Sequence, residues 1–174
     1  MLGIKDVIRP DIPEAIKKCH AAGIKVRMIT GDNKITASTV AQECGIFDDS
    51  MPREEQVMEG PAFFELLGGF ASAEGEEAKG VKKPENFKEI EGKLRVLARA
   101  RPEDKLLLVM ALQEMGGVVA VTGEGTNDAP AIKKADVGFA MGISGTDIAK
   151  EAADMLILDD NFNSVFNACM MGRK

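Results

Sequence analysis

The 174-residue sequence contains no tryptophan and no tyrosine, and its aromatic content is only 5%. Aliphatic residues are plentiful instead, a profile that suits a helix-covered parallel sheet better than a β-sandwich. No apolar run approaches the roughly 18–20 residues that are needed to span a bilayer. No signal peptide opens the printed sequence either. From the sequence alone we therefore expect a soluble chain.

Cysteine is rare, and basic residues are outnumbered by acidic ones. The three cysteines, Cys19, Cys44 and Cys169, lie far apart and follow no metal-ligand spacing, which predicts a reducing compartment rather than a disulfide framework. The chain has 22 Lys and Arg against 28 Asp and Glu, a net charge of −6, and no long basic run. This balance argues against a nucleic-acid-binding surface.

What the sequence does contain is a repeated alternation of short apolar runs and helical stretches, within a length that fits one domain. The apolar runs predict strands at residues 24–30, 94–98, 118–121, 137–140 and 155–158. The stretches between them predict helices at residues 12–22, 34–44, 104–115, 128–134, 146–153 and 162–171. Strand–helix units joined by short loops predict an α/β fold, a Rossmann-like parallel sheet flanked by helices.

Residues 48–93 interrupt this alternation with a composition dominated by Glu, Lys, Gly and Pro. A short helix is expected over residues 61–67, whereas residues 71–80 contain too little apolar surface to order themselves. We expect residues 48–93 to form a polar insertion on the surface, with a flexible tip.

The stretch that begins at Val118 is the most informative part of the chain. Residues 118–121 have the composition of a strand buried on both faces. The strand then breaks at Gly123 and Gly125, and a helix with Pro130 in its first turn follows. A strand that ends in glycines and carboxylates beside a helix N-terminus is suited to hold phosphate and a hard cation.

Two further strand ends carry polar clusters, Thr30-Gly31-Asp32 and residues 99–105. Because ligands collect at the carboxyl ends of parallel strands, the three clusters offer one site a hydroxyl, backbone N–H groups, a lysine and carboxylates for Mg²⁺. That inventory fits phosphoryl transfer, although no nucleophile stands out. Each cluster also has an ordinary interpretation, such as a turn with a helix cap, and spacing alone does not decide between them.

The same residues resemble the phosphorylation domain of P-type cation-transporting ATPases, which has a haloacid dehalogenase-like fold. The resemblance rests on Thr30-Gly31-Asp32, Lys105, Thr-Gly-Glu-Gly-Thr-Asn-Asp-Ala-Pro-Ala at residues 122–131 and Ala-Asp-Val-Gly-Phe-Ala-Met-Gly at residues 135–142. It runs from Gly3 to Arg173 and is weak only in the polar insertion. Arg-Pro-Asp-Ile-Pro-Glu-Ala-Ile at residues 9–16 is most similar to the calcium pumps of the plasma-membrane type.

This resemblance implies an ATP-driven calcium pump, a translocase and hydrolase that works through an aspartyl-phosphate intermediate. It implies that Thr30 and the Gly31 backbone hold the phosphate, and that Lys105 neutralises the phosphoryl oxygens. Further roles follow by position: Asp32 beside the nucleotide and hinge, Arg99 towards the nucleotide ribose, Asn127 and Asp128 in the phosphate and Mg²⁺ network, and Asp6 and Arg9 in the hinge. The implied cofactors are Mg²⁺ and ATP.

One departure from the family is that the phosphorylated Asp-Lys-Thr-Gly-Thr motif matches nothing in this sequence. We therefore expect residues 1–174 to be the C-terminal part of the phosphorylation domain, and the isolated chain to be inactive. Its implied partners are the nucleophile-bearing segment, the nucleotide-binding domain and the membrane helices of the same pump. The chain would then be a cytoplasmic domain of an integral membrane protein.

A second departure is Glu124, which stands where the family has an aspartate that binds Mg²⁺ directly. The extra methylene moves the carboxylate by roughly 1–1.5 Å, and Mg²⁺ tolerates little deviation from octahedral geometry. We expect weakened or rearranged Mg²⁺ binding at Glu124 and Asp128.

The absent nucleophile strand also has a structural consequence. In the family it lies between the strand that ends at Thr30 and the strand that ends at Thr122, so two inner edges would be left unpaired. Three outcomes stay open: the gap closes, the chain forms a dimer through these edges, or it is marginally stable.

Other functional classes fit the sequence less well. A non-catalytic interaction or regulatory module is favoured mildly by Glu124 and by the absent nucleophile. A free-standing phosphatase of the haloacid dehalogenase type is disfavoured, because no nucleophile strand is found in the sequence. An NAD-binding domain is weaker still, since residues 122–127 lack the GxGxxG spacing.

Overall fold

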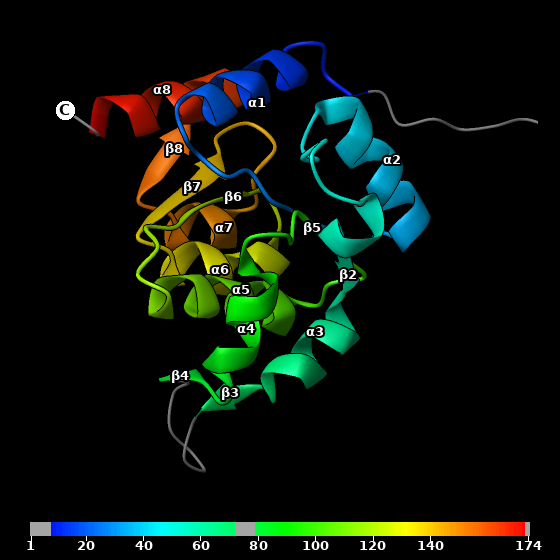
Figure 1. Ribbon diagram of the computed structural model, residues 1–174. Helices are drawn as coiled ribbons and strands as arrows, with labels where there is room; N and C mark the ends of the chain where they lie inside the picture. Colours follow the sequence, from blue (N-terminus) through cyan, green and yellow to red (C-terminus); the bar gives the residue numbers. More distant parts are fainter. Residues whose placement is uncertain (1–7, 72–78, 173–174) are drawn as a thin grey trace, which may run out of the picture.

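The computed structural model describes residues 8–71 and 79–172, and Figure 1 shows how its helices and strands are arranged. The elements in chain order are α1 (Ile12–Ala21), β1 (Met28–Ile29), α2 (Lys34–Cys44), η1 (Arg53–Gln56), β2 (Val57–Glu59), α3 (Gly60–Leu67), β3 (Phe70–Ala71), β4 (Gly80–Val81), α4 (Pro84–Glu91), β5 (Val96–Ala98), α5 (Pro102–Glu114), β6 (Ala120–Gly123), η2 (Thr126–Asp128), α6 (Ala129–Lys134), β7 (Val137–Met141), α7 (Asp147–Ala152), β8 (Met155–Ile157) and α8 (Phe162–Gly172). No helix in these described ranges combines the length and apolarity required to cross a membrane.

Two parallel sheets of three strands each form the framework, which confirms the predicted α/β fold. The first sheet has the order β1-β5-β2, with Met28 and Val57 on either side of Val96. The second sheet has the order β6-β7-β8, with Val121 opposite Gly138 and Ala140 opposite Leu156. A small antiparallel hairpin of β3 and β4 stands apart from both sheets.

Each sheet has one edge strand that leads into a polar cluster. Within the described residues β1 pairs with β5 alone, and β6 pairs with β7 alone, so both inner edges are unpaired, as expected. The prediction that residues 118–121 are buried on both faces is wrong: Val119 is buried against Val109 and Ala131, but Val118 is 88% exposed and β6 alternates between exposed and half-buried. A strand of this composition is buried only when a neighbour covers each side, and here one neighbour is lacking.

Helices cover both faces of the first sheet. On one face α3, α4 and α5 enclose a core around Leu97, in which the rings of Phe63 and Phe87 meet edge to face with centroids 6.2 Å apart. On the other face α1 and α2 pack against Val96 through Ile16 and Ala37. As a result all three residues of β5 are buried.

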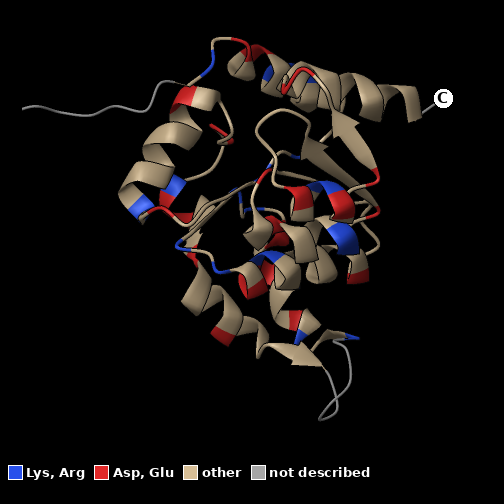
Figure 2. Cartoon of the chain, turned by 180° about the vertical axis from the view of Figure 1, so that it is seen from behind, with Lys and Arg blue, Asp and Glu red and all other residues tan. Residues whose placement is uncertain are grey.

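The second sheet is covered in the same way through alternate residues of β7. Ala140 packs against Ile132 of α6 and Ala149 of α7, whereas Phe139 packs against Val165 of α8. Helices α1 and α8 lie side by side along one side of the molecule (Figure 1). Helix α8 contains no charged residue, and Figure 2 shows Lys, Arg, Asp and Glu interspersed along the other helices rather than gathered into one basic face.

Residues 48–93 require a correction, because most of this segment is part of the fold rather than a surface excursion. Its strand β2 pairs with β5 in the first sheet, and its apolar residues Phe63, Leu67 and Phe87 are fully buried. The expected helix over residues 61–67 is present as α3. The acidic composition masked these widely spaced apolar positions. Residues 72–78, in the expected flexible tip, lie outside the described residues.

Helix ends follow the predicted chemistry at most positions. Gly45 and Gly23 end their helices with φ of 75° and 74°, a conformation that glycine adopts without strain. The Thr146 hydroxyl accepts a hydrogen bond from the Ala149 N–H and begins α7, as predicted. Asp11 precedes α1 but its side chain caps nothing. The strand expected over residues 24–30 is paired only at Met28–Ile29.

Candidate functional site

The first polar cluster forms a compact turn directly after β1. The Thr30 hydroxyl accepts a hydrogen bond from the Asp32 N–H (3.1 Å) and donates one to the Asp32 carboxylate (3.0 Å). Asn33 rather than Asp32 caps α2, because its side-chain oxygen accepts from the N–H groups of Ile35 and Thr36, both at 3.0 Å. Gly31 and Asp32 are exposed, so this turn presents its backbone at the carboxyl end of the first sheet.

Arg99 supports this turn through its backbone. Its N–H donates to the Asp32 carbonyl oxygen at 2.8 Å, and the next N–H, from Ala100, donates to the Thr30 carbonyl oxygen at 2.9 Å. Arg99 has a φ of 48°, an uncommon conformation for a side chain of this size. Its guanidinium lies 3.6 Å from the Glu59 carboxylate. The side chain is therefore paired with β2, and the role expected of it at a nucleotide is not tested by this arrangement.

The second polar cluster joins α5 to the loop that follows β6. The Lys105 ammonium lies 2.6 Å from Oδ1 of Asp128, with both side chains largely shielded from solvent. The other carboxylate oxygen, Oδ2, accepts from the N–H groups of Gly125 at 3.0 Å and Glu124 at 3.3 Å. Burial raises the pKa of Asp128, but the hydrogen bonds from Lys105 and Gly125 outweigh it and hold the pKa below its ordinary value.

The glycine at position 123 is required by this close packing. A Cβ there would lie 2.6 Å from the Cβ of Asp128, a distance that real Cβ atoms essentially never show. Gly123 thus allows the end of β6 to approach Asp128, and Asp128 in turn orders the loop through the two N–H groups. The structure thus brings Lys105 and Asp128, two of the predicted site residues, into contact.

Glu124 belongs to the same loop, but its carboxylate faces a different partner. Its Oε2 accepts a hydrogen bond from the Ser144 hydroxyl at 2.9 Å, and its carbonyl oxygen accepts from the Thr146 N–H at 2.8 Å. Sequence reasoning missed Ser144, which lies in the loop between β7 and α7. The signal that could have found it is position, because this loop also follows the carboxyl end of a strand adjacent to β6.

The remaining predicted residues lie at the margins of the site. Asn127 is exposed in η2, between the glycines and Asp128. The Arg9 guanidinium donates to the Asp160 carbonyl oxygen, which ties the segment before α1 to the end of β8. Asp6 lies outside the described residues. Among the described residues, no hydrogen bond or salt bridge joins the Thr30 cluster to the Lys105 and Asp128 cluster.

The described residues do not form a Mg²⁺ site by themselves. No group of three or more His, Cys, Asp or Glu side chains converges anywhere in residues 8–71 and 79–172. Both oxygens of Asp128 already accept hydrogen bonds, and one oxygen of Glu124 does so. Because Mg²⁺ demands near-octahedral oxygen coordination, this donor set is incomplete.

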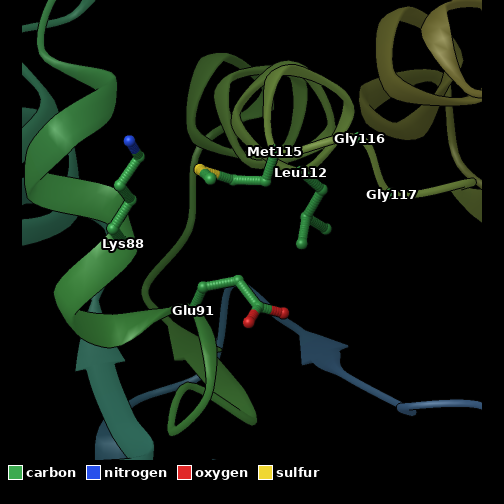
Figure 3. A pocket seen from close by; sticks show the side chains of 6 residues that line it. All are labelled: Lys88, Glu91, Leu112, Met115, Gly116 and Gly117. Atoms are coloured by element: carbon green, nitrogen blue, oxygen red, sulfur yellow. The ribbon is translucent and has the colours of Figure 1, made fainter.

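A cavity of about 300 Å³ lies elsewhere, between α4 and the end of α5, and Figure 3 shows the side chains that line it. It is bordered by Lys88, Glu91, Leu112, Met115, Gly116 and Gly117. Gly116 and Gly117 precede β6, so the cavity lies at the amino ends of the strands. It is therefore separate from the polar clusters.

Known proteins are similar to this chain in sequence and in fold. A family model described as haloacid dehalogenase-like hydrolase matches residues 1–136. Calcium-transporting ATPase 2 of Schizosaccharomyces pombe is 50% identical over 98% of this chain and 12% of its own length. Plasma membrane calcium-transporting ATPase 1 of Mus musculus is 51% identical over 99% of this chain and 14% of its own length. The chain thus spans a small part of these curated relatives.

Two solved structures share the fold. A zinc-transporting PIB-type ATPase in an E2.Pi state has a TM-score of 0.62 and 28% identity, over 94% of this chain and 19% of that one. The catalytic domain of the CPx-ATPase CopB-B has a TM-score of 0.63 and 22% identity, over 94% of this chain and 46% of that one. At 22% identity the second comparison shows the fold alone.

Proposed function

This chain belongs to the haloacid dehalogenase-like hydrolase family, and from that premise we propose that it is part of the phosphorylation domain of an ATP-driven calcium pump. The names of relatives that are about half identical to it over nearly its whole length support calcium as the transported ion. The pump would work through an aspartyl-phosphate intermediate, with this chain in the cytoplasm beside the membrane helices of the same protein.

The observation that carries the proposal is that β1 and β6 each have one unpaired edge. Both are edges of parallel sheets, and both lead directly into a polar cluster. A single parallel strand lying between them would pair with both edges and would end beside Thr30, Lys105 and Asp128. A carboxylate at the end of that strand would be the phosphorylated aspartate. The printed sequence has no Asp-Lys-Thr-Gly-Thr motif, so we propose that another segment of the pump supplies it.

The residues of this chain would then act mainly by position and charge, as phosphoryl transfer requires. The Thr30 hydroxyl and the exposed Gly31 N–H would hold phosphoryl oxygens, and the Lys105 ammonium would exchange its Asp128 contact for the transferred group. Asn127 would complete the phosphate network from η2. Asp32 and Arg99 would face the nucleotide, for which Arg99 must leave Glu59.

We propose that the parent pump uses ATP and Mg²⁺, and that Mg²⁺ supplies the positive charge that offsets the phosphoryl oxygens. This chain alone does not provide the ligands, since Asp128 is held by Lys105 and Glu124 by Ser144. We therefore expect the isolated chain to bind Mg²⁺ weakly and to be inactive.

A phosphorylation assay with γ-labelled ATP and Mg²⁺ tests this proposal. The chain alone should take up no acid-stable, hydroxylamine-sensitive label. A companion polypeptide with the Asp-Lys-Thr-Gly-Thr strand and a P-type nucleotide-binding domain should be labelled only when the chain is added. The chain with Lys105→Ala should reduce that labelling at least tenfold, whereas Lys88→Ala, at the opposite end of the strands, should not. Label on this chain itself would contradict the proposal.

A second candidate is a non-catalytic interaction module, which the engaged Glu124 and Asp128 carboxylates favour. It predicts that the companion polypeptide binds the chain but is never labelled. An Asp-Lys-Thr-Gly-Thr motif upstream in the longer reading frame would decide for the pump.

A further inference from the structure

The loop of residues 142–146, between β7 and α7, is held in place by Asp160. The Asp160 side chain accepts hydrogen bonds from the Ile143 N–H at 3.0 Å and the Ser144 N–H at 2.7 Å. Asp160 is only 6% exposed, and its φ of 49° is one that aspartate tolerates better than most residues. These two hydrogen bonds to a nearly buried carboxylate fix the backbone at Ser144, so the direction of its hydroxyl group is constrained.

The Ser144 hydroxyl connects this loop to the acidic residue after β6. It donates to Oε2 of Glu124 at 2.9 Å and also faces the Asp160 carboxylate. The order of the second sheet gives this hydrogen bond a direction. β7 lies on one side of β6, and the unpaired edge lies on the other. The bond to Ser144 therefore draws the Glu124 carboxylate towards β7 and away from the unpaired edge.

The length of the acidic side chain matters for this contact. An aspartate at position 124 would be shorter by roughly 1–1.5 Å, and the Ser144 hydroxyl would then lie beyond hydrogen-bonding distance. Glu124 and Ser144 thus form a matched pair that an aspartate would not form. Both acidic side chains near the end of β6 accept hydrogen bonds from within the chain, Asp128 from Lys105 and Glu124 from Ser144.

We propose that Ser144, fixed by Asp160, is a positioning residue that holds the Glu124 carboxylate out of the position where it would bind a divalent cation. This inference rests on the proposed function, because it concerns the metal of that phosphoryl-transfer site. Two features then disfavour Mg²⁺ binding by Glu124 and Asp128: the length of the Glu124 side chain and its hydrogen bond with Ser144.

Paramagnetic Mn²⁺ tests the proposal on the 174-residue chain without ATP and without any partner. Mn²⁺ broadens the NMR signals of nearby backbone amides, so a titration followed at residues 124–128 reports the Mn²⁺ affinity of this loop alone. Wild type should show weak broadening. Ser144→Ala should strengthen Mn²⁺ binding by about five- to tenfold, the equivalent of one ordinary intramolecular hydrogen bond.

Three further variants separate positioning from a general structural effect. Ser144→Thr keeps a hydroxyl and should restore the weak binding of wild type. Ser164→Ala removes a similar bond, from a hydroxyl to the Asp159 carboxylate at 2.8 Å, and should leave the titration unchanged. Glu124→Asp should bind Mn²⁺ more tightly, and adding Ser144→Ala to it should bring no further gain. Amide spectra of each variant establish that it is folded.

Unchanged or weaker Mn²⁺ binding by a folded Ser144→Ala chain would overturn the proposal, as would equal binding by wild type and Glu124→Asp. The outcome is independent of the phosphorylation assay, which depends on a companion strand and ATP. Tighter binding by Ser144→Ala together with failed labelling would refute the pump and leave the role of Ser144 intact.

Discussion

The two sheets contain similar strands in opposite surroundings. Residues 94–98 and residues 118–121 are comparably apolar runs, and each is followed by polar residues. In the first sheet β5 has a neighbour on each side and helices on both faces, and all its residues are buried. In the second sheet β6 has one neighbour, and no residue in it is buried.

The burial of a strand is therefore set by the elements around it rather than by its own composition. The half that contains β5 has a complete core of aromatic and aliphatic side chains. The half that contains β6 lacks a strand beside β6, and one edge of the first sheet, at β1, is unpaired as well. The polar clusters follow these two edges. The main apolar core and the polar clusters of the proposed site therefore lie in different parts of the molecule.

The largest expected effect comes from the core of the complete half. Phe87→Ala removes a fully buried ring that packs edge to face on Phe63. We expect it to lower the free energy of unfolding by about 3–5 kcal/mol. Because the chain has no tryptophan or tyrosine, far-UV circular dichroism in urea is the appropriate measurement.

The matched change in the incomplete half is Val118→Ala, at a side chain that is 88% exposed. It should alter the free energy of unfolding by less than about 0.5 kcal/mol. Comparable losses at the two positions would show that Val118, just before β6, is covered in solution, and would contradict this contrast between the two sheets.

An effect smaller than that of Phe87→Ala is expected at the contact between Lys105 and Asp128. Asp128→Asn weakens the contact with Lys105 and the two backbone hydrogen bonds, and should lower the free energy of unfolding by about 1–3 kcal/mol near neutral pH. Glu65→Gln, an exposed change of the same charge, serves as the control and should have little effect.

The pH dependence of the Asp128 contribution has a definite sign. Burial raises the pKa of Asp128, while Lys105 and the Gly125 N–H lower it by more, so the folded pKa lies below the unfolded value. The stabilisation is therefore complete above the unfolded pKa of about 3.9 and is lost as the pH falls through the folded pKa. The stability difference between wild type and Asp128→Asn should shrink below about pH 4; a difference that grows there would contradict this account.

Much of the fold could be predicted from the sequence, because local signals decided it. Glycine at position 45 and threonine at position 146 mark helix ends by simple backbone chemistry. The polar clusters were also predictable, since they follow strands of a parallel sheet. The buried positions of α3 and α4 were missed, because Phe87 is isolated among charged residues and the short apolar run around Phe63 is flanked by polar, glycine-rich sequence.

The partners of the acidic side chains could not be predicted from spacing. Glu124 and Ser144 are 20 residues apart, and their contact depends on the pairing of β6 with β7. The exposure of β6 likewise depends on which strands surround it. Such features are set by tertiary arrangement, which no local pattern encodes.

The central claim is that a single strand pairs with the free edges of both β1 and β6. Amide hydrogen exchange tests this claim most directly. In the free chain the Ile29 N–H points away from β5, and the Ala120 and Thr122 N–H groups point away from β7. These three amides should exchange far faster than the amides of β5. A peptide with an apolar run followed by Asp-Lys-Thr-Gly-Thr should slow exchange in β1 and β6 together, with one peptide bound per chain. Slow exchange at both strands in the free chain, or no change on adding the peptide, would contradict the claim.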